Sequence, residues 1–259
     1  MTDPTGRQPA DPQAEAPQPE EHPGRPTDVT PQHPLAEIPR PFTREAMNAL
    51  ERQIKDGILR MGSMVAESHL AAIAALEEHD ETAASAIIRG DDRLNEELEL
   101  VSNLVTQTIV KEQPVARDLR FLMALDHVAY ELERMGDYAG SVAKQARKLA
   151  PRAPLPPQNR LAELGRMVVQ QVRDILTVVV EVDEARAREI AGRDDDVDEL
   201  YHAIFDETLE AMRQDPDNVD GGARILFAAH YLERTGDRVT NIAEDIVFLA
   251  TGEVEDLNQ

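Results

Sequence analysis

Two segments of the same pattern carry the residues of this sequence that could do chemistry. Glu133-Arg-Met-Gly-Asp137 recurs further along the chain as Glu233-Arg-Thr-Gly-Asp237. Residues four apart on an α-helix lie on one face, so each segment would present two carboxylates side by side. Like charges placed this way repel each other, and a cation bound between them removes that repulsion. The pattern therefore favours a site for a hard metal ion.

A second stretch in each half of the chain could supply further oxygen ligands. Asp91 and Asn95 are four residues apart, and Asp194 and Asp198 are their counterparts. If the helices that carry them pack beside the helices with the Glu-Asp pairs, each half collects four oxygen-bearing side chains. Oxygen ligands suit Mg²⁺, Mn²⁺ or iron, whereas Zn²⁺ is a less favoured candidate because the chain has no Cys.

An alternative interpretation leaves these carboxylates solvated and paired with Arg134 and Arg234. Recurrence of the pattern in both halves, beside the same apolar seam, favours metal binding over this alternative. Gly136 and Gly236 indicate close helix contact, since a glycine inside a helix costs about 1 kcal/mol relative to alanine. Packing alone could also account for these glycines.

Few other kinds of site fit the sequence. It has no Walker loop, no Gly-rich dinucleotide turn, no His-Glu-x-x-His and no Gly-x-Ser-x-Gly. A ferritin-like di-iron enzyme would need Glu-x-x-His pairs, and Gly136 and Gly236 stand where the histidines would be. His202 and His230 lie near the second Glu-Asp pair, and their role as additional ligands stays open.

Long helices must position these residues. From Phe42 onward, apolar residues recur at spacings of three and four without strand-like alternation, and prolines divide the pattern. Thr43 and Asp80 are suitable N-caps, and Pro114 is acceptable in a first helical turn. We expect six helices, over residues 43–78, 80–113, 114–150, 158–182, 183–214 and 217–250.

The six segments are two copies of three. In the third and sixth segments, Leu125, Ala129 and Leu132 match Ile225, Ala229 and Leu232 at a shift of 100 residues, and the second and fifth match at a shift of 103. Seams of this spacing suit antiparallel bundles. The sequence thus predicts an all-α protein of two tandem, pseudo-symmetric three-helix bundles, over residues 43–150 and 158–252, with a linker at 151–157 and a tail at 253–259.

Composition limits the remaining possibilities. Residues 1–41 hold 11 of the 17 prolines and almost no large apolar side chain, so we expect a disordered, acidic tail. With 50 acidic and 27 basic residues, the chain has a net charge of −23, which disfavours nucleic acid as a partner. The absence of Cys excludes disulfides, and we find no signal peptide and no apolar run that could enter a membrane.

The motifs also resemble a known family. Leu132-Glu-Arg-Met-Gly-Asp137 and the segment Leu232-Glu-Arg-Thr-Gly-Asp-Arg-Val-Thr-Asn-Ile-Ala-Glu-Asp-Ile-Val-Phe-Leu-Ala-Thr-Gly252 are similar to the two signature helices of the PhoU family. The similarity extends to Asp91-Asp-Arg-Leu-Asn95 and Arg117-Asp-Leu-Arg120 and covers residues 42–252. It implies the tandem three-helix fold and metal bound at Glu133/Asp137 and Glu233/Asp237, with Asp91/Asn95 and Asp194/Asp198 facing them.

The resemblance further implies a function. It points to a non-enzymatic, cytoplasmic regulator that works with the ATPase subunit of a phosphate ABC transporter and with a sensor histidine kinase. Such a regulator keeps the phosphate-starvation response off when phosphate is plentiful, and we expect it to form a homodimer or a larger homo-oligomer. Two alternatives stay open: an accessory subunit of another phosphate transporter, and a carboxylate-bridged di-metal enzyme.

Overall fold

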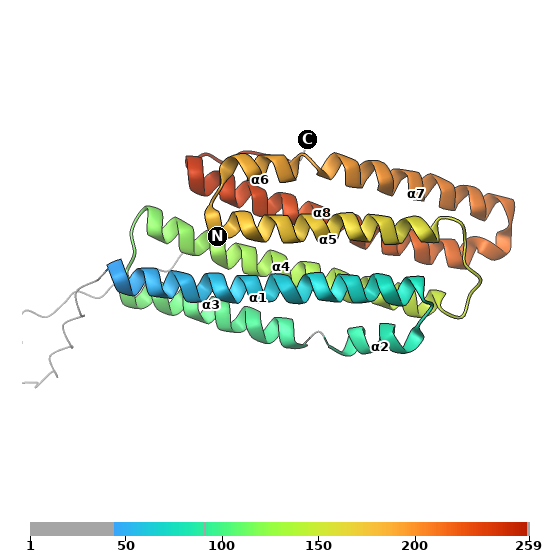
Figure 1. The fold of residues 1–259 in the computed structure, drawn as a ribbon, viewed down its shortest axis with the longest axis horizontal. Helices are drawn as coiled ribbons and strands as arrows, with labels where there is room; N and C mark the ends of the chain where they lie inside the picture. The colour runs from blue at the N-terminus through green and yellow to red at the C-terminus, as the bar shows by residue number, and fades with distance from the viewer. Residues whose placement is uncertain (1–43, 91, 258–259) are drawn as a thin grey trace, which may run out of the picture. The chain divides into compact units, whose positions relative to one another are not determined.

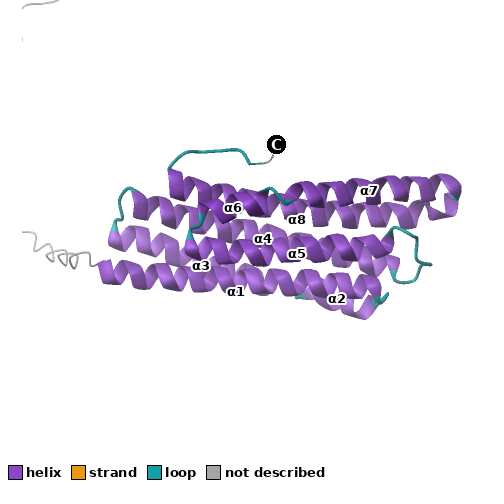
Figure 2. Cartoon of the chain, turned by 45° about the horizontal axis from the view of Figure 1, so that its top comes forward, coloured by secondary structure: helices purple, strands orange, loops and turns teal. Residues whose placement is uncertain are grey.

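The computed structural model describes residues 44–90 and 92–257, and over these ranges the chain is helical apart from its connections (Figures 1 and 2). The elements are α1 (Arg44–Glu77), α2 (Glu81–Arg89), α3 (Asp92–Glu112), α4 (Arg117–Leu149), α5 (Gln158–Glu181), α6 (Glu184–Ala191), α7 (Asp194–Gln214), a short 3₁₀ helix (Pro216–Asn218) and α8 (Val219–Thr251). The predicted all-α class is confirmed. No helix in these ranges is long and apolar enough to cross a membrane.

The second helix of each repeat is broken in two, so the prediction of continuous helices over 80–113 and 183–214 is wrong. The interruptions fall at Gly90, between α2 and α3, and at Gly192 and Arg193, between α6 and α7. Glycine is a poor helix former, and a break leaves backbone groups without helical partners. In the second repeat, Gln171 of α5 satisfies one of them, because its Nε2 donates to the Arg193 carbonyl at 3.0 Å.

Two helix starts also differ from the prediction. The fourth helix begins at Arg117 instead of Pro114, after Ala116, which has φ 47°. The last long helix begins at Val219 instead of Asp217, because the residues before it form the 3₁₀ turn. The predicted cap Thr43 and the Pro-rich tail at 1–41 lie outside the described residues.

The first long helix of each repeat ends in the same way. His79 after α1 and Val182 after α5 both adopt φ 54°, in the left-handed region that closes many helices. The next residue then caps the following helix: the Asp80 carboxylate accepts from two backbone N–H groups of α2, and that of Asp183 accepts from the N–H of Arg186. The Asp80 cap predicted from sequence is confirmed.

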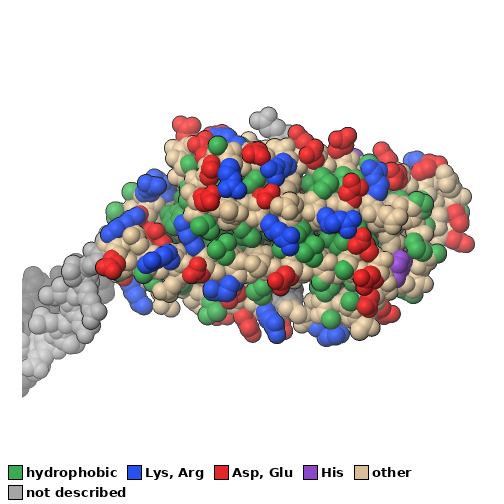
Figure 3. Space-filling model, viewed as in Figure 1, with side chains coloured by type: hydrophobic (Ala, Val, Ile, Leu, Met, Phe, Trp, Pro, Cys, Tyr) green, Lys and Arg blue, Asp and Glu red, His purple; other side chains and the backbone are tan. Residues whose placement is uncertain are grey.

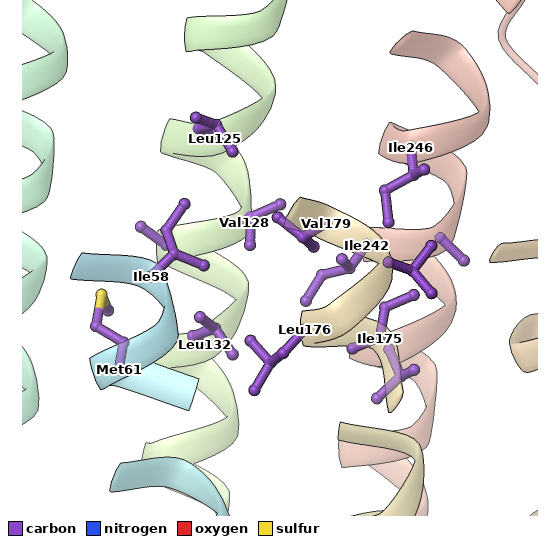
Figure 4. Packing of buried hydrophobic residues seen from close by; sticks show 14 of the residues in the cluster. Ile58, Met61, Leu125, Val128, Leu132, Ile175, Leu176, Val179, Ile242 and Ile246 are labelled. Atoms are coloured by element: carbon purple, nitrogen blue, oxygen red, sulfur yellow. The ribbon is translucent and has the colours of Figure 1, made fainter. Parts of the chain in front are cut away.

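The hydrophobic core runs from one repeat into the other. Helices α1 and α4 pack against α5 and α8 at the centre, whereas α2 and α3 lie outside the first pair and α6 and α7 outside the second (Figure 1). Figure 4 shows Met61 of α1 and Leu132 of α4 in the same cluster as Leu176 of α5 and Ile242 of α8. The twofold repeat is as predicted, but each hydrophobic cluster of the described helices includes residues of both repeats.

The contact between α1 and α5 is built from two equivalent glycine positions. Gly62 faces the side chain of Leu176, and Gly165 faces Ile73. A methyl group at either glycine would overlap the facing branched side chain. Positions 62 and 73 become 165 and 176 at a shift of 103 residues, so each repeat offers one glycine to the other in a pseudo-twofold arrangement.

The contact between α4 and α8 has the same symmetry with different chemistry. On one side Arg238 Nη1 and Asn241 Nδ2 donate to the buried Glu131 carboxylate at 3.4 and 3.2 Å. On the equivalent side the rings of Tyr138 and Tyr231 stack with centroids 6.0 Å apart. An ion pair and an aromatic pair thus occupy corresponding places.

A buried histidine adds a polar link between the repeats. His69 of α1 is 1% exposed; its Nδ1–H donates to the Val65 carbonyl at 3.1 Å, and its Nε2 lies 3.1 Å from Thr235 Oγ1 of α8. Burial lowers the pKa of His69 to about 4, so the imidazole is neutral near pH 7. It therefore bridges the two helices without placing a charge in the core.

The glycine contacts lead to a stability prediction. Gly165→Ala should destabilise the protein by about 1–3 kcal/mol, because the added methyl group meets Ile73 in a packed interface. Gly140→Ala is the matched control on α4: no atom lies within 4 Å of its added Cβ, so helix propensity should stabilise that variant by about 0.5–1 kcal/mol. Urea unfolding followed by circular dichroism measures both. Equal effects of the two substitutions would contradict the proposed contact.

Candidate functional site

Four of the predicted site residues come together in the second repeat. Asp194 and Asp198 lie in the first turns of α7, facing Glu233 and Asp237 on α8. Asp194 is 8% exposed, and the other three side chains are half-buried. These four residues are called the carboxylate cluster below.

The carboxylates of this cluster disfavour one another's ionisation. Burial raises the pKa of Asp194 to about 6, and the charges of Asp198 and Asp237 act in the same direction. Burial and then the charges of Asp237 and Asp198 raise the pKa of Glu233 to about 7. The pKa of Asp198 is raised as well, by burial and by Asp237. A cation in this position would relieve both the repulsion and the desolvation.

The neighbouring helices hold the cluster in place. Gly236 lets α7 approach α8 closely, since a Cβ at this position would lie 2.8 Å from Asp194 Oδ1. The Thr240 hydroxyl donates a hydrogen bond to Asp194, and the Arg234 guanidinium lies 3.3 Å from Asp237. The break before α7, held by Gln171, sets the position of its first turn. The close helix contact that Gly236 indicated is therefore present.

Three further side chains border the cluster. Nδ1–H of His202 donates to the Asp198 carbonyl at 2.7 Å, and Nδ1 of His230 lies 3.4 Å from Glu233 Oε2. The pKa of Tyr201 is raised by burial and by the charges of Glu233 and Asp198. Sequence reasoning had considered both histidines but not Tyr201 or Thr240. Tyr201 follows Asp198 by three residues and Thr240 follows Asp237 by three, which was the available signal.

Three of the four predicted site residues of the first repeat are among the described residues. Glu133 and Asp137 are half-buried on α4, and Asn95 is exposed on α3. The predicted Asp91 lies outside the described residues. Gly136 faces Leu94, and its counterpart Gly236 faces Asp194 and Val197, the counterpart of Leu94.

The donor chemistry of the second cluster fits a hard metal ion. Its four side chains are all carboxylates, and ionisation of Asp194 and Glu233 is disfavoured. Within the described part of the chain, however, no three His, Asp or Glu side chains are gathered at distances that would hold a metal. Side-chain rotation would have to bring the ligands together on binding.

The raised pKa of Glu233 predicts that replacing its carboxylate with a neutral group increases the stability of the fold, by an amount that depends on pH. Because the pKa of Glu233 is raised from 4.5 to about 7 in the folded state, its ionisation destabilises the folded protein as the pH rises above 4.5. The full destabilisation is reached above about pH 7. Glu233→Gln should therefore stabilise the protein by on the order of 1 kcal/mol at pH 8 in chelator-containing buffer, a rise in Tm of a few degrees, and the gain should vanish near pH 4.5.

The exposed Glu199→Gln on α7 is the matched control for this prediction. It removes the same charge from the same region of the molecule, and its effect should be within about 0.5 kcal/mol at either pH. Thermal unfolding at the two pH values measures both variants. Equal Tm values for Glu233→Gln and the wild type at pH 8 would show that the carboxylates do not repel each other appreciably.

Comparison with known proteins places these helices in a family. The PhoU domain model matches the chain twice, over residues 58–146 and 161–246, one match in each repeat. A crystal structure of PhoU from Pseudomonas aeruginosa superposes with a TM-score of 0.76 at 28% identity, covering 80% of this chain and all of the other. The PhoU structure from Streptococcus pneumoniae gives a TM-score of 0.76 at 26% identity, covering 81% of this chain and 99% of the other.

Curated relatives agree with the family model. The chain is 36% identical over 218 residues to the phosphate-specific transport system accessory protein PhoU homolog of Clostridium acetobutylicum, covering 84% of this chain and all of that protein. It is 38% identical over 198 residues to the protein of the same name from Caulobacter vibrioides, covering 76% of this chain and 86% of the other. With both repeats matched and the fold shared, this chain belongs to the PhoU family.

Proposed function

We propose that this protein is a regulatory accessory protein of a phosphate-specific transport system. The observation that carries the proposal is the match of the PhoU domain to both repeats, together with a curated relative, named a phosphate-specific transport system accessory protein, that aligns over its full length. In this proposal the protein is not an enzyme. It works in the cytoplasm, where it contacts the ATPase subunit of a phosphate ABC transporter and a sensor histidine kinase. It acts there as a homodimer or a larger homo-oligomer.

The carboxylate cluster is the proposed metal site of the second repeat. Asp194, Asp198, Glu233 and Asp237 would hold Mg²⁺, Mn²⁺ or iron, and the first repeat would use Glu133, Asp137, Asn95 and Asp91 in the same way. Support comes from the all-oxygen donor set and from the raised pKa values of Asp194 and Glu233. A bound cation supplies positive charge between two helices that otherwise present like charges to each other.

The chain's own residues give such a site a structural consequence. Without a cation, repulsion between Asp198 and Asp237 opposes the approach of α7 to α8. Gly236 keeps the two helices close despite this repulsion. Metal occupancy would therefore strengthen the α7–α8 contact, and we propose that it stabilises the form of the protein that partners recognise.

The metal proposal predicts that each repeat binds separately. Asp137→Ala should abolish binding in the first repeat and leave the second intact, Asp237→Ala should do the reverse, and the double variant should lose both sites. Calorimetric titration with Mn²⁺ measures the stoichiometry, and Asp206→Ala, an exposed aspartate of α7, is the control. Equal metal content in the double variant and the wild type would return these side chains to a solvated acidic surface.

The regulatory proposal is tested in cells. Deleting the gene should switch on phosphate-uptake genes in phosphate-rich medium, and a plasmid copy of the wild-type gene should restore repression. Transcript levels of the transporter genes measure the effect. If transcripts stay at the wild-type level in the deletion strain, the protein is better described as an accessory of another phosphate transporter.

A further inference from the structure

An apolar groove runs along the outer face of the second repeat. It encloses about 350 Å³ between α7 and α8 and is lined by Tyr201, Met212, Ala223, Leu226, Phe227 and His230. Phe227 is 50% exposed, and Phe205, 36% exposed, lies beside Tyr201 with ring centroids 6.3 Å apart. Phe205 is not part of the groove lining but adjoins it through Tyr201, and exposed aromatic side chains in and beside a groove are typical of a surface that contacts another molecule.

The fold does not require this groove. At the shifts that relate the repeats, Phe205 corresponds to Ser102 and Leu226 corresponds to Asp126. In the first repeat the Ser102 hydroxyl donates to the Asp126 carboxylate at 2.7 Å, so a polar pair occupies the equivalent place. At these two positions the first repeat is therefore polar where the second is apolar, whereas Met123 and Tyr130, the equivalents of Ala223 and His230, are exposed there as well.

The charge around the groove restricts what can bind there. Helix α7 has 21 residues, of which eight are Asp or Glu and one, Arg213, is Lys or Arg. Figure 3 shows carboxylates along the edge of the molecule that α7 forms. One end of the groove meets the carboxylate cluster, since His230 in its lining lies 3.4 Å from Glu233. The groove is thus apolar inside, with the acid-rich helix α7 along one side and Glu233 of the carboxylate cluster at one end.

We propose that this groove binds a basic amphipathic helix of a partner protein. Such a helix would place apolar side chains at spacings of three and four residues against Phe227 and Phe205, with lysine or arginine facing the carboxylates of α7. The inference goes beyond the proposed function and does not depend on metal binding.

Charge complementarity favours this occupant over two others. A second copy of the chain would bring its own excess of negative charge, −23 in total, against the carboxylates of α7. An anionic lipid surface would be repelled for the same reason. A basic amphipathic helix would be attracted over long range by the carboxylates of α7, which raises its rate of association. Once bound, it would bury the exposed aromatic side chains, which favours the complex.

The test uses the full chain and a designed peptide. The probe is a fluorescein-labelled helical peptide of 18 residues with a Leu/Phe stripe and lysines on the remaining faces. One control peptide has the same composition in permuted order, and another has glutamine in place of lysine. Fluorescence anisotropy gives the Kd values for the wild type, Phe227→Ser and Met123→Ser. Met123 is the matched control because it is 54% exposed on the equivalent helix α4.

We expect Phe227→Ser to weaken binding of the designed peptide by about tenfold or more and Met123→Ser by less than about twofold. The permuted and glutamine peptides should each bind at least about tenfold more weakly to the wild type. Equal affinity of the permuted peptide, or equal effects of the two substitutions, would overturn the proposal. So would a loss of self-association in Phe227→Ser by sedimentation with peptide binding unchanged, which would assign the groove to a second copy.

Discussion

The close approach of α1 to α5 is the contact on which the remaining arrangement depends. Gly62 and Gly165 each accept a branched side chain from the other repeat, so the two helices lie nearer than ordinary side chains would permit. This proximity brings α4 against α8, and the apolar faces of both repeats meet in clusters that span the two. It also sets Gln171 of α5 where it can bind the interrupted backbone before α7. The first turn of α7, with its carboxylates, follows from that chain of contacts.

The carboxylate cluster holds like charges close together, and the stability of the packed core offsets their repulsion. Asp194 and Glu233 are held where both lose hydration and face like charges. A protein can keep such unfavourable charges when packing elsewhere in the fold offsets their cost in stability. This arrangement is common at ligand-binding sites. His230 lines the apolar groove and also lies beside Glu233, so the groove and the carboxylate cluster are adjacent. A molecule bound at one would therefore lie close to the other.

Sequence reasoning reached the fold because its signals were periodic and repeated. Two patterns were sufficient to predict the long helices and their repeat: the apolar seam through Leu132 and Leu232, and the recurring Glu-Arg-x-Gly-Asp. The second pattern also identified Glu233 and Asp237 of the carboxylate cluster. The breaks at Gly90 and Gly192 were missed because a lone glycine is often tolerated inside a helix. The second break is stabilised by the side chain of Gln171, which is distant in sequence. The shared core was missed because heptad seams do not specify which helices of another repeat they face.

The unlike pairs between α4 and α8 make the two repeats non-interchangeable. If two copies of the first repeat met in the same geometry, Glu131 would face Tyr138 on both sides, and a buried carboxylate would lose Arg238 and Asn241. Two copies of the second would set Tyr231 against Arg238 and leave the guanidinium without its carboxylate. Each half is therefore complementary to the other and not to itself. A chain emerging from the ribosome carries, in its second half, the partner that its first half requires.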